Sequence, residues 1–316
     1  MNILFTGASS FTGMWFVKEL AESGHNVTAI FSKNLEDYED LRQERILKIL
    51  DHCKPVFSCK FGEPKFFETI ASASHFDMLC HHAADVTNYK SPDFDVAAAL
   101  ANNTKNLPQV LQSLKLKGCK KVLLTGSVFE QREGQGSDVL RAVSPYGLSK
   151  GLSSDVFQFY CHIYNMKLGK FVIPNPFGPY EEPRFTTFLI KSWYEGKTPP
   201  VSAPDYSRDN IPVSLLAKTY LNFATNLNSE PGYEKINPSF YAGKQGEFTL
   251  HFAKEMEKRL KMPCKVELQK QTTFPEPEIR TNTDPIDLKQ VDWNEEKAWD
   301  ELAEYYKTRY SNAKTV

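Results

Sequence analysis

Short apolar runs alternate with longer amphipathic stretches along the first half of the chain. Apolar runs bounded by turn residues predict buried β-strands. Such runs lie at residues 1–6, 26–31, 56–61, 76–83, 120–127 and 168–175. Segments with apolar side chains at helical spacing separate them and predict helices at 11–24, 36–51, 65–74 and 94–115. We expect Pro108 to disturb the last of these helices, because proline removes a backbone donor.

This alternation predicts an α/β fold with a Rossmann-like, doubly wound parallel sheet covered by helices on both faces. Beyond residue 176 the regularity is lost. Nine prolines between residues 176 and 238 indicate loops and short elements, with helices expected at 246–261 and 294–310. We therefore expect a Rossmann domain at 1–175 and a smaller, irregular lobe at 176–316, with a chain that can cross back between them.

The bulk properties are those of a soluble globular protein. Of the 316 residues, 24% are charged and 41% are hydrophobic, and the formal net charge is −1. A chain without a basic excess is not expected to bind nucleic acid or an anionic membrane surface. It has no apolar run of the roughly 18 residues that a membrane-spanning helix needs, and its first residues do not resemble a secretory signal. We therefore expect a cytoplasmic protein.

The six cysteines are scattered and form no C-x-x-C pair, so we expect reduced and mostly buried thiols. Cys80 is followed by His81 and His82, a combination that could bind a metal. No second group of ligands has the spacing of a zinc site, however, and the surrounding residues fit the end of a buried strand better. We expect no metal.

A glycine turn, TGASSFTG at residues 6–13, joins the first predicted strand to the first predicted helix. A tight turn with little side-chain bulk lets backbone N–H groups and the helix N-terminus face a pyrophosphate, although it can also be a simple connection. The turn resembles the T-G-x-x-G-x-x-G fingerprint of the extended short-chain dehydrogenase/reductase family. Thr6, Gly7, Phe11 and Gly13 fit this fingerprint, and Ser10 replaces its middle glycine.

The end of the second predicted strand bears on the choice of cofactor. An acidic residue there would accept a hydrogen bond from the ribose of NAD and repel the 2′-phosphate of NADP. The strand is followed instead by Ser32 and Lys33, which favours NADP, with NAD as the alternative. The resemblance implies a cofactor site formed by Gly7, Ser9, Ser10, Phe11, Thr12, Gly13, Ser32, Lys33, Ala83, Ala84 and Lys150.

Candidate catalytic residues follow the fifth predicted strand. If a helix begins near Pro145, Tyr146 and Lys150 share one helical face, and the ammonium group favours the phenolate form of the tyrosine. The phenol could then exchange a proton with a carbinol or carbonyl oxygen while a nicotinamide carries the hydride. A hydroxyl at the strand end should hold that oxygen. Position along the strand favours Ser127, whereas likeness of the next residues to the family's V-Y-G segment favours Thr125.

Later motifs resemble those of family members that act on nucleotide-activated sugars. Residues 175–179, NPFGP, resemble the N-V-Y-G-P segment, which implies that Asn175 approaches a sugar diphosphate. Arg208 and Arg280 correspond to phosphate-binding arginines, and Arg184 is placed in the sugar pocket from its position alone. Val172 departs from the family pattern, because many relatives have an arginine there.

The same resemblance narrows the chemistry. Relatives that dehydrate the sugar carry an Asp-Glu pair after the strand-five threonine, whereas Gly126 and Ser127 follow Thr125 here. A 4-keto sugar reductase is placed slightly ahead of an NAD-dependent 4-epimerase, and a non-catalytic dinucleotide-binding protein is the third alternative. A homodimer is also implied, through helices near 94–115 and 145–165. The apolar residues of these helices could lie either in the hydrophobic core or in the dimer interface. They are Leu107, Val110, Leu111, Leu114, Phe157, Phe159 and Ile163.

Overall fold

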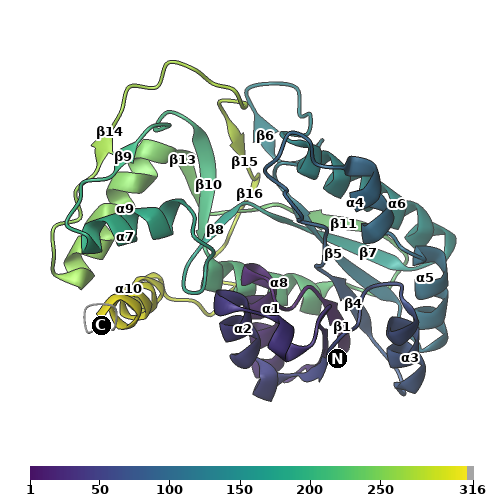
Figure 1. Ribbon diagram of the computed structural model, residues 1–316. Helices are drawn as coiled ribbons and strands as arrows, with labels where there is room; N and C mark the ends of the chain where they lie inside the picture. Colours follow the sequence, from purple (N-terminus) through teal and green to yellow (C-terminus); the bar gives the residue numbers. More distant parts are fainter. Residues whose placement is uncertain (312–316) are drawn as a thin grey trace. The chain divides into compact units, whose positions relative to one another are not determined.

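The computed structural model describes residues 1–311 and contains two compact units (Figure 1). Unit 1 comprises Met1–Glu133, Leu140–Ile173 and Ala217–Asn237, so the chain leaves it and returns. Unit 2 comprises Gly134–Val139, Pro174–Leu216 and the chain from Pro238 onward. Each unit has its own hydrophobic core. None of the helices within residues 1–311 combines the length and the apolar character needed to cross a membrane.

Unit 1 is built on a seven-stranded, entirely parallel sheet with the order β11-β7-β5-β4-β1-β2-β3. The strands are β1 (Asn2–Thr6), β2 (Asn26–Ile30), β3 (Lys54–Val56), β4 (Met78–His81), β5 (Lys121–Ser127), β7 (Lys167–Ile173) and β11 (Gly232–Ile236). The central strands are buried on both faces, which explains their nearly continuous apolar sequences. The predicted doubly wound α/β fold is confirmed.

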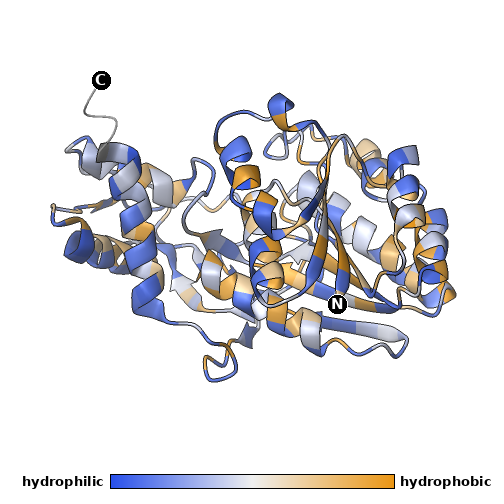
Figure 2. Cartoon of the chain, turned by 90° about the horizontal axis from the view of Figure 1, so that it is seen from below, coloured by the Kyte–Doolittle hydropathy of each residue, from blue (hydrophilic) through white to orange (hydrophobic). Residues whose placement is uncertain are grey.

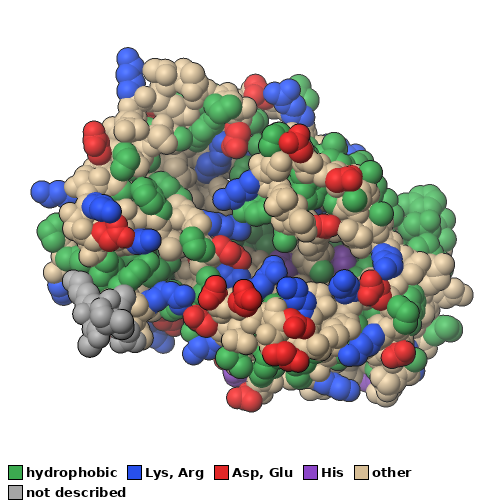
Figure 3. Space-filling view, viewed as in Figure 1, with side chains coloured by type: hydrophobic (Ala, Val, Ile, Leu, Met, Phe, Trp, Pro, Cys, Tyr) green, Lys and Arg blue, Asp and Glu red, His purple; other side chains and the backbone are tan. Residues whose placement is uncertain are grey.

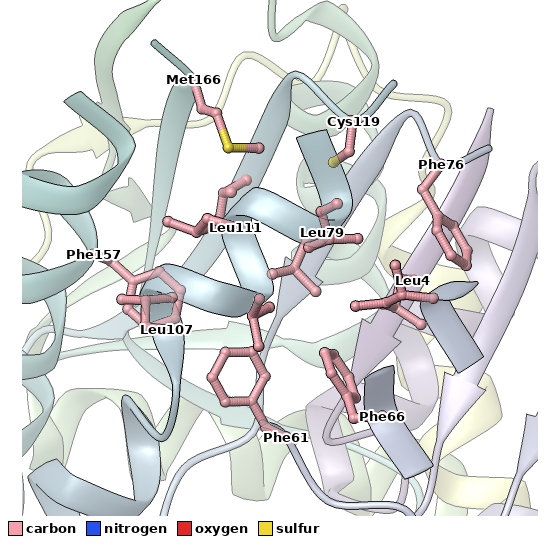
Figure 4. Packing of buried hydrophobic residues seen from close by; sticks show 14 of the residues in the cluster. Leu4, Phe61, Phe66, Phe76, Leu79, Leu107, Leu111, Cys119, Phe157 and Met166 are labelled. Atoms are coloured by element: carbon pink, nitrogen blue, oxygen red, sulfur yellow. The ribbon is translucent and has the colours of Figure 1, made fainter. Parts of the chain in front are cut away.

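Helices cover both faces of this sheet. They are α1 (Phe11–Glu22), α2 (Asp40–Leu47), α3 (Pro64–Ser72), α4 (Val96–Asn103), α5 (Leu107–Leu116), α6 (Pro145–Ile163) and α8 (Val213–Asn226), with short 3₁₀ helices at Leu35–Asp37 and Leu50–His52. On one face, α3, α5 and α6 contribute to a core that includes Leu4, Leu79 and Phe157 (Figure 4). On the other face, the rings of Phe16 from α1 and Tyr220 from α8 stack with centroids 4.0 Å apart.

Two predicted elements differ in the structure. The helix expected at 94–115 is divided into α4 and α5, because Asn106 adopts a left-handed conformation with φ 51°. Pro108 lies in the first turn of α5, where proline costs no hydrogen bond. The strand expected at 56–61 was wrong, because β3 ends at Val56 and Ser58 has φ 49°. The sequence pattern also missed α8 and β11.

The structure separates core from surface along α5 and α6. The predicted interface candidates Leu107, Val110, Leu111, Leu114 and Phe157 are fully buried in the core of unit 1. In contrast, Phe159 is 59% exposed and Ile163 is 57% exposed. These two residues lie four positions apart on α6, so they present one apolar patch to the surroundings.

Within the described residues, unit 2 combines short strands with three helices of its own. Its helices are α7 (Phe185–Tyr194), α9 (Gln245–Leu260) and α10 (Glu295–Ser311), and its strands are β6 (Gln135–Gly136), β8 (Asn175–Phe177), β9 (Pro200–Val201), β10 (Ser207–Pro212), β12 (Pro238–Ser239), β13 (Tyr241–Lys244), β14 (Glu267–Leu268), β15 (Arg280–Thr281) and β16 (Asp284–Pro285). Its core is strongly aromatic, with Phe177, Phe252 and Trp299 in mutual ring contact. The helices expected at 246–261 and 294–310 are confirmed as α9 and α10.

The surface agrees with the near-neutral composition. Lys and Arg side chains are interspersed with Asp and Glu over the visible face (Figure 3). Hydrophobic positions run along the strands near the N-terminus, whereas hydrophilic positions lie mainly on loops and outer helix faces (Figure 2). No broad single-sign patch on this face points to a highly charged partner.

The exposed patch on α6 leads to a test of the expected homodimer. We expect the wild-type protein to have a dimeric mass at micromolar concentration, and the Phe159→Glu/Ile163→Glu variant to be monomeric, because charges would be buried in the interface. Light scattering coupled to gel filtration measures the mass. Val139→Glu is the control, because Val139 is 85% exposed and lies in unit 2. A monomeric wild-type mass would contradict the prediction.

Candidate functional site

The ends of β1 and β4 meet where the strand order of the sheet reverses, which is the usual ligand site of an open α/β sheet. Gly7 follows β1 with φ +82°, and a Cβ atom there would lie 2.7 Å from the backbone nitrogen of Ala83. The Ala83 N–H donates to Thr6 Oγ1 at 3.2 Å, which joins the two strand ends. Only glycine satisfies both the backbone angle and the close approach.

Ser10, in place of the family's middle glycine, caps helix α1. Its Oγ accepts a hydrogen bond from the Gly13 N–H at 3.1 Å and donates to the Gly7 carbonyl at 2.9 Å. At Gly13, a Cβ atom would lie 2.2 Å from the Gly7 carbonyl oxygen, so no side chain fits there. The hydroxyl of Ser10 therefore turns inward and binds the turn, although the residue departs from the fingerprint.

His82 completes this arrangement, and the sequence considered it only as a possible metal ligand. Its Nε2 lies 2.9 Å from Ser10 Oγ and 3.2 Å from Thr12 Oγ1. Burial, assisted by the charge of Lys150, lowers the pKa of His82 to about 3, so the ring is neutral. Because the Ser10 proton goes to the Gly7 carbonyl, the proton on His82 belongs on Nε2, from which it can be donated to Ser10.

The turn fits a dinucleotide diphosphate. Its glycines keep the backbone compact, and the N-terminus of α1 begins directly beyond it. The side chain of Phe11 is buried under the guanidinium group of Arg45, 5.8 Å from the ring centroid, so only its backbone is available to a ligand. Ser9 and Ala84 remain partly exposed beside the same strand ends.

Ser32 and Lys33 are exposed directly after β2. The Ser32 hydroxyl lies 3.2 Å from the phenolic oxygen of Tyr38, and the Lys33 N–H donates to the same oxygen at 3.2 Å. The Tyr38 phenol therefore fixes the backbone of this segment and leaves the lysine side chain at the surface. A hydroxyl and a cation here suit a 2′-phosphate.

Tyr146 and Lys150 lie in the first two turns of α6, which begins at Pro145 as expected. Ser144 caps the helix by accepting from the Gly147 N–H at 3.1 Å. The Tyr146 ring contacts the rings of Tyr89 and Phe94 edge to face, at centroid distances of 5.5 Å and 6.0 Å. These aromatic neighbours come from the loop after β4, and no sequence motif pointed to them.

Lys150 is 7% exposed, and its Nζ donates to the Thr125 carbonyl at 2.5 Å. The two candidate hydroxyls at the end of β5 differ in their surroundings. Thr125 is 3% exposed, so its hydroxyl is buried in unit 1. Ser127 is half-buried, and its Oγ accepts from the Phe129 N–H at 3.3 Å. A substrate oxygen can therefore reach Ser127 more readily than Thr125.

The proposed substrate residues all belong to unit 2. Arg208 is bound to its own unit: its NH1 donates to the carbonyls of Ser207 and Pro277 at 3.0 Å, and its NH2 to Glu276 at 3.0 Å. Arg280 is 1% exposed on β15, a strand that lies beside β10 through a bridge between Ser207 and Ile279. The predicted phosphate contacts of both arginines remain predictions.

Two further predicted residues lie on the segment that leads from β8 into α7. Asn175 begins β8 and pairs with Asn210 of β10, and Arg184 precedes α7 with its guanidinium 3.9 Å from Glu182. Between them, the carboxyl of Glu181 is buried and accepts from Thr186 Oγ1 at 2.6 Å. Burial raises the pKa of Glu181 to about 7.

A Rossmann sheet with a glycine turn at its switch point and a Tyr-Lys pair beside strand five defines a dinucleotide-binding protein of the short-chain dehydrogenase/reductase type. The model of the NAD dependent epimerase/dehydratase family matches residues 3–237, and the chain belongs to this family. The resemblance found in the sequence is thereby confirmed. No curated protein matches the chain.

Solved structures with the same fold include three nucleotide-sugar enzymes. UDP-glucose 4-epimerase from Thermotoga maritima, with UDP-glucose, is 17% identical, with a TM-score of 0.73 and coverage of 98% of this chain and 100% of that one. UDP-glucuronic acid 4-epimerase from Bacillus cereus, with UDP-glucuronic acid and NAD, is 18% identical (TM-score 0.72; 98% and 100% covered). The dTDP-glucose 4,6-dehydratase DesIV from Streptomyces venezuelae is 14% identical (TM-score 0.71; 98% of each chain covered).

The cap formed by Ser10 predicts an effect on stability. Ser10→Ala should lower the free energy of unfolding by about 1 kcal/mol, because the N-cap acceptor is lost, whereas Ser10→Gly should cost only a few tenths of a kcal/mol. Urea denaturation followed by circular dichroism measures both values. Equal losses in the two variants would show that Ser10 does not act as a cap.

The buried carboxyl of Glu181 predicts a dependence of stability on pH. Between pH 4.5 and about 7 the folded protein retains a proton that the unfolded chain releases, so the Glu181 contribution weakens as the pH rises and is constant above that range. Relative to Glu181→Gln, the wild type should lose on the order of 1–3 kcal/mol between pH 4.5 and 8. Urea denaturation at the two pH values measures the difference, and parallel pH profiles would refute it.

Proposed function

We propose that the protein is an NAD(P)-dependent enzyme that acts at C4 of a nucleotide-activated sugar, most simply as a 4-epimerase. The observation that carries the proposal is the position of Tyr146 and Lys150. They begin a helix packed on β5, in the same unit as a glycine turn that fits a dinucleotide diphosphate. Membership of the NAD dependent epimerase/dehydratase family supports the same chemistry.

Each catalytic side chain has a role that follows from its surroundings. A bound nicotinamide dinucleotide would supply the hydride acceptor and donor. Lys150 is held by the Thr125 carbonyl, and its ammonium favours the phenolate form of Tyr146. Tyr146 takes the proton from the sugar hydroxyl as the C4 carbonyl forms and returns it when the carbonyl is reduced. Ser127 donates a hydrogen bond that orients the same oxygen.

The surroundings of Gly126 argue against a dehydratase. A Cβ atom at this position would lie 2.6 Å from the Lys170 Cε and 3.2 Å from the Glu130 Oε1, so the acidic side chain that dehydrating relatives carry there would have to displace this buried ion pair. The nearest carboxylate, that of Glu130, is fully buried, ion-paired with Lys170 and bound to the Ser127 N–H. It is therefore not available to remove water from a sugar.

Two reactions remain, 4-epimerisation and reduction of a 4-keto sugar, and we now place epimerisation first. The sequence placed a 4-keto sugar reductase slightly ahead, whereas the family model and the epimerases of the same fold favour the 4-epimerase. The reductase remains the second candidate because Ser32 and Lys33, not an acidic residue, follow β2 and suit NADP. Epimerisation would use NAD that is retained through the cycle.

Two observations support a nucleotide sugar as the substrate: the motif residues of unit 2, and the structures of the same fold that contain UDP-glucose or UDP-glucuronic acid. We propose that Arg208 and Arg280 contact the diphosphate and that Asn175 and Arg184 approach the sugar. A cytoplasmic location fits a nucleotide-sugar substrate. The binding-only alternative is disfavoured, because Tyr146, Lys150 and Ser127 are all present.

Removing the phenol tests this proposal. Tyr146→Phe should lower kcat at least 100-fold with UDP-glucose, UDP-galactose or UDP-glucuronic acid, since proton transfer by a positioned side chain contributes about 10²–10⁴-fold. Cofactor affinity should change little. Tyr89→Phe is the matched control, because it removes a phenolic hydroxyl from a ring that contacts Tyr146. Chromatography of the nucleotide sugars measures turnover.

The identity of the cofactor, and whether the protein retains it, distinguish a 4-epimerase from a 4-keto sugar reductase. Mass spectrometry of the denatured protein should detect retained NAD if the protein is an epimerase, whereas an empty protein that oxidises NADPH with a 4-keto sugar would be a reductase. Unchanged turnover in Tyr146→Phe would refute both. Absence of turnover in the wild type together with tight dinucleotide binding would favour the binding-only alternative.

A further inference from the structure

A group of four charged residues lies beside the end of β5 in unit 1, and three of them, Glu130, Glu133 and Lys170, are buried. Lys170 of β7 is 3% exposed, and its Nζ lies 2.7 Å from carboxylate oxygens of both Glu130 and Glu133. Lys235 of β11 lies 2.8 Å from the second oxygen of Glu133. Glu130 is fully buried, so ionised groups occupy a place where apolar side chains would normally pack.

Glu130 is joined to the strand that carries the catalytic hydroxyl. Its Oε1 accepts from the Ser127 N–H at 2.7 Å, and its own N–H donates to the Ser127 carbonyl at 3.0 Å. Hydrogen bonds to a charged acceptor are about twice as strong as neutral ones. The position of the Ser127 backbone is therefore set by Glu130.

Lys150 holds the neighbouring peptide group of the same strand end. Its Nζ donates to the Thr125 carbonyl, which belongs to the peptide unit before the one that carries the Ser127 N–H. A buried cation and a buried anion thus bind consecutive peptide groups. β5 ends at Ser127, which pairs with Ile173 of β7.

Gly126 makes room for this arrangement. A Cβ atom at residue 126 would lie 2.6 Å from Lys170 Cε and 3.2 Å from Glu130 Oε1. The ion pair therefore fills the space beside the strand end, and any side chain at residue 126 would displace it. The glycine and the buried pair form one structural unit.

The same carboxylate acts on the charge of Lys150. Burial lowers the pKa of Lys150, Glu130 raises it and Lys170 lowers it. His81 and His82 also face this lysine from the end of β4, but burial lowers the pKa of each to about 3, so both are neutral. Tyr146 lies on the same helix. Glu130 therefore counteracts part of the effect of burial on the Lys150 ammonium, whose pKa stays below its ordinary value.

We propose that Glu130 is a positioning residue of the active site, whose carboxylate fixes Ser127 and places a negative charge beside the peptide group that Lys150 binds, while Lys170 and Glu133 hold that carboxylate in place. The proposal rests on the proposed function, since it assigns Glu130 an effect on the catalytic groups of that reaction. It adds a residue that touches neither the sugar nor the dinucleotide.

Two substitutions separate the roles of charge and hydrogen bonding. Glu130→Gln keeps an oxygen that can accept from the Ser127 N–H but removes the charge, whereas Glu130→Ala removes both. With the UDP-sugar that the wild type converts, Glu130→Ala should lower kcat about 10–100-fold with little change in KM, and Glu130→Gln should recover part of the loss. Glu19→Gln is the control, because Glu19 is a largely buried carboxylate paired with Lys218 at 2.8 Å.

A double-mutant cycle with Ser127→Ala tests whether Glu130 acts through Ser127. In the Ser127→Ala background, Glu130→Ala should cause a much smaller further loss of kcat than in the wild type, because the hydroxyl that it positions is already absent. Equal losses in both backgrounds would overturn this part of the proposal, since Glu130 would then act independently of Ser127.

A measurement without substrate tests the effect on Lys150. In protein labelled with ¹³C at the lysine ε-carbons, the Lys150 signal is assigned by its absence in Lys150→Arg and titrated by NMR. Glu130→Gln should move its midpoint to lower pH by roughly one pH unit, whereas Glu19→Gln should leave it unchanged. An unmoved midpoint in Glu130→Gln would overturn the electrostatic role, and the near-isosteric change keeps this test available if Glu130→Ala does not fold.

Different results would refute the proposed function and the positioning role of Glu130. If Tyr146→Phe abolishes turnover but Glu130→Ala retains wild-type kcat, the positioning role is refuted and the proposed function stands. If turnover survives in Tyr146→Phe, the proposed function is refuted. The titration of Lys150 then still decides whether Glu130 maintains its charge, because that measurement requires neither substrate nor turnover.

Discussion

The site depends on one buried ammonium ion. Lys150 is enclosed by α6 and the end of β5, and its charge is held by the Thr125 carbonyl at 2.5 Å. Burying an ammonium ion without partners would cost folding free energy. The groups around Lys150 must therefore supply hydrogen-bond acceptors and negative charge. Glu130 supplies the negative charge, and the parallel sheet presents the carbonyl. The position of Lys150 in the proposed catalytic pair is thus tied to how the strand end is stabilised.

The glycine turn after β1, the proposed diphosphate site, is stabilised in a comparable way. Replacement of the middle glycine by Ser10 would be unfavourable if its side chain faced a ligand, but the hydroxyl turns inward to Gly7, Gly13 and His82. His82 is neutral because burial lowers its pKa to about 3, so it can bind a hydroxyl without adding charge beside a diphosphate. The serine in place of the family's middle glycine is therefore compatible with a diphosphate bound at this turn.

The sequence predicted the parallel sheet, the glycine turn and the Tyr-Lys helix, because each depends on local periodicity or on a short motif. It did not predict the ion group of Glu130 and Lys170, since these residues are 40 positions apart and meet only through the pairing of β5 with β7. The sequence allowed the chain to cross back between the lobes, but it did not predict the elements α8 and β11, which lie in the returning segment. The strand predicted at 56–61 failed because a left-handed residue, Ser58, interrupts an otherwise apolar run.

Chemistry at C4 of a nucleotide sugar requires that Lys150 act on the reacting groups and not merely stabilise the fold. The most direct test is the rate at which absorbance at 340 nm appears when NAD-loaded protein is mixed with UDP-glucose or UDP-glucuronic acid in a single turnover. The account predicts that this rate rises with pH in the wild type and falls at least 100-fold in Lys150→Met, although the variant still binds NAD. An unchanged rate in NAD-loaded Lys150→Met would contradict it.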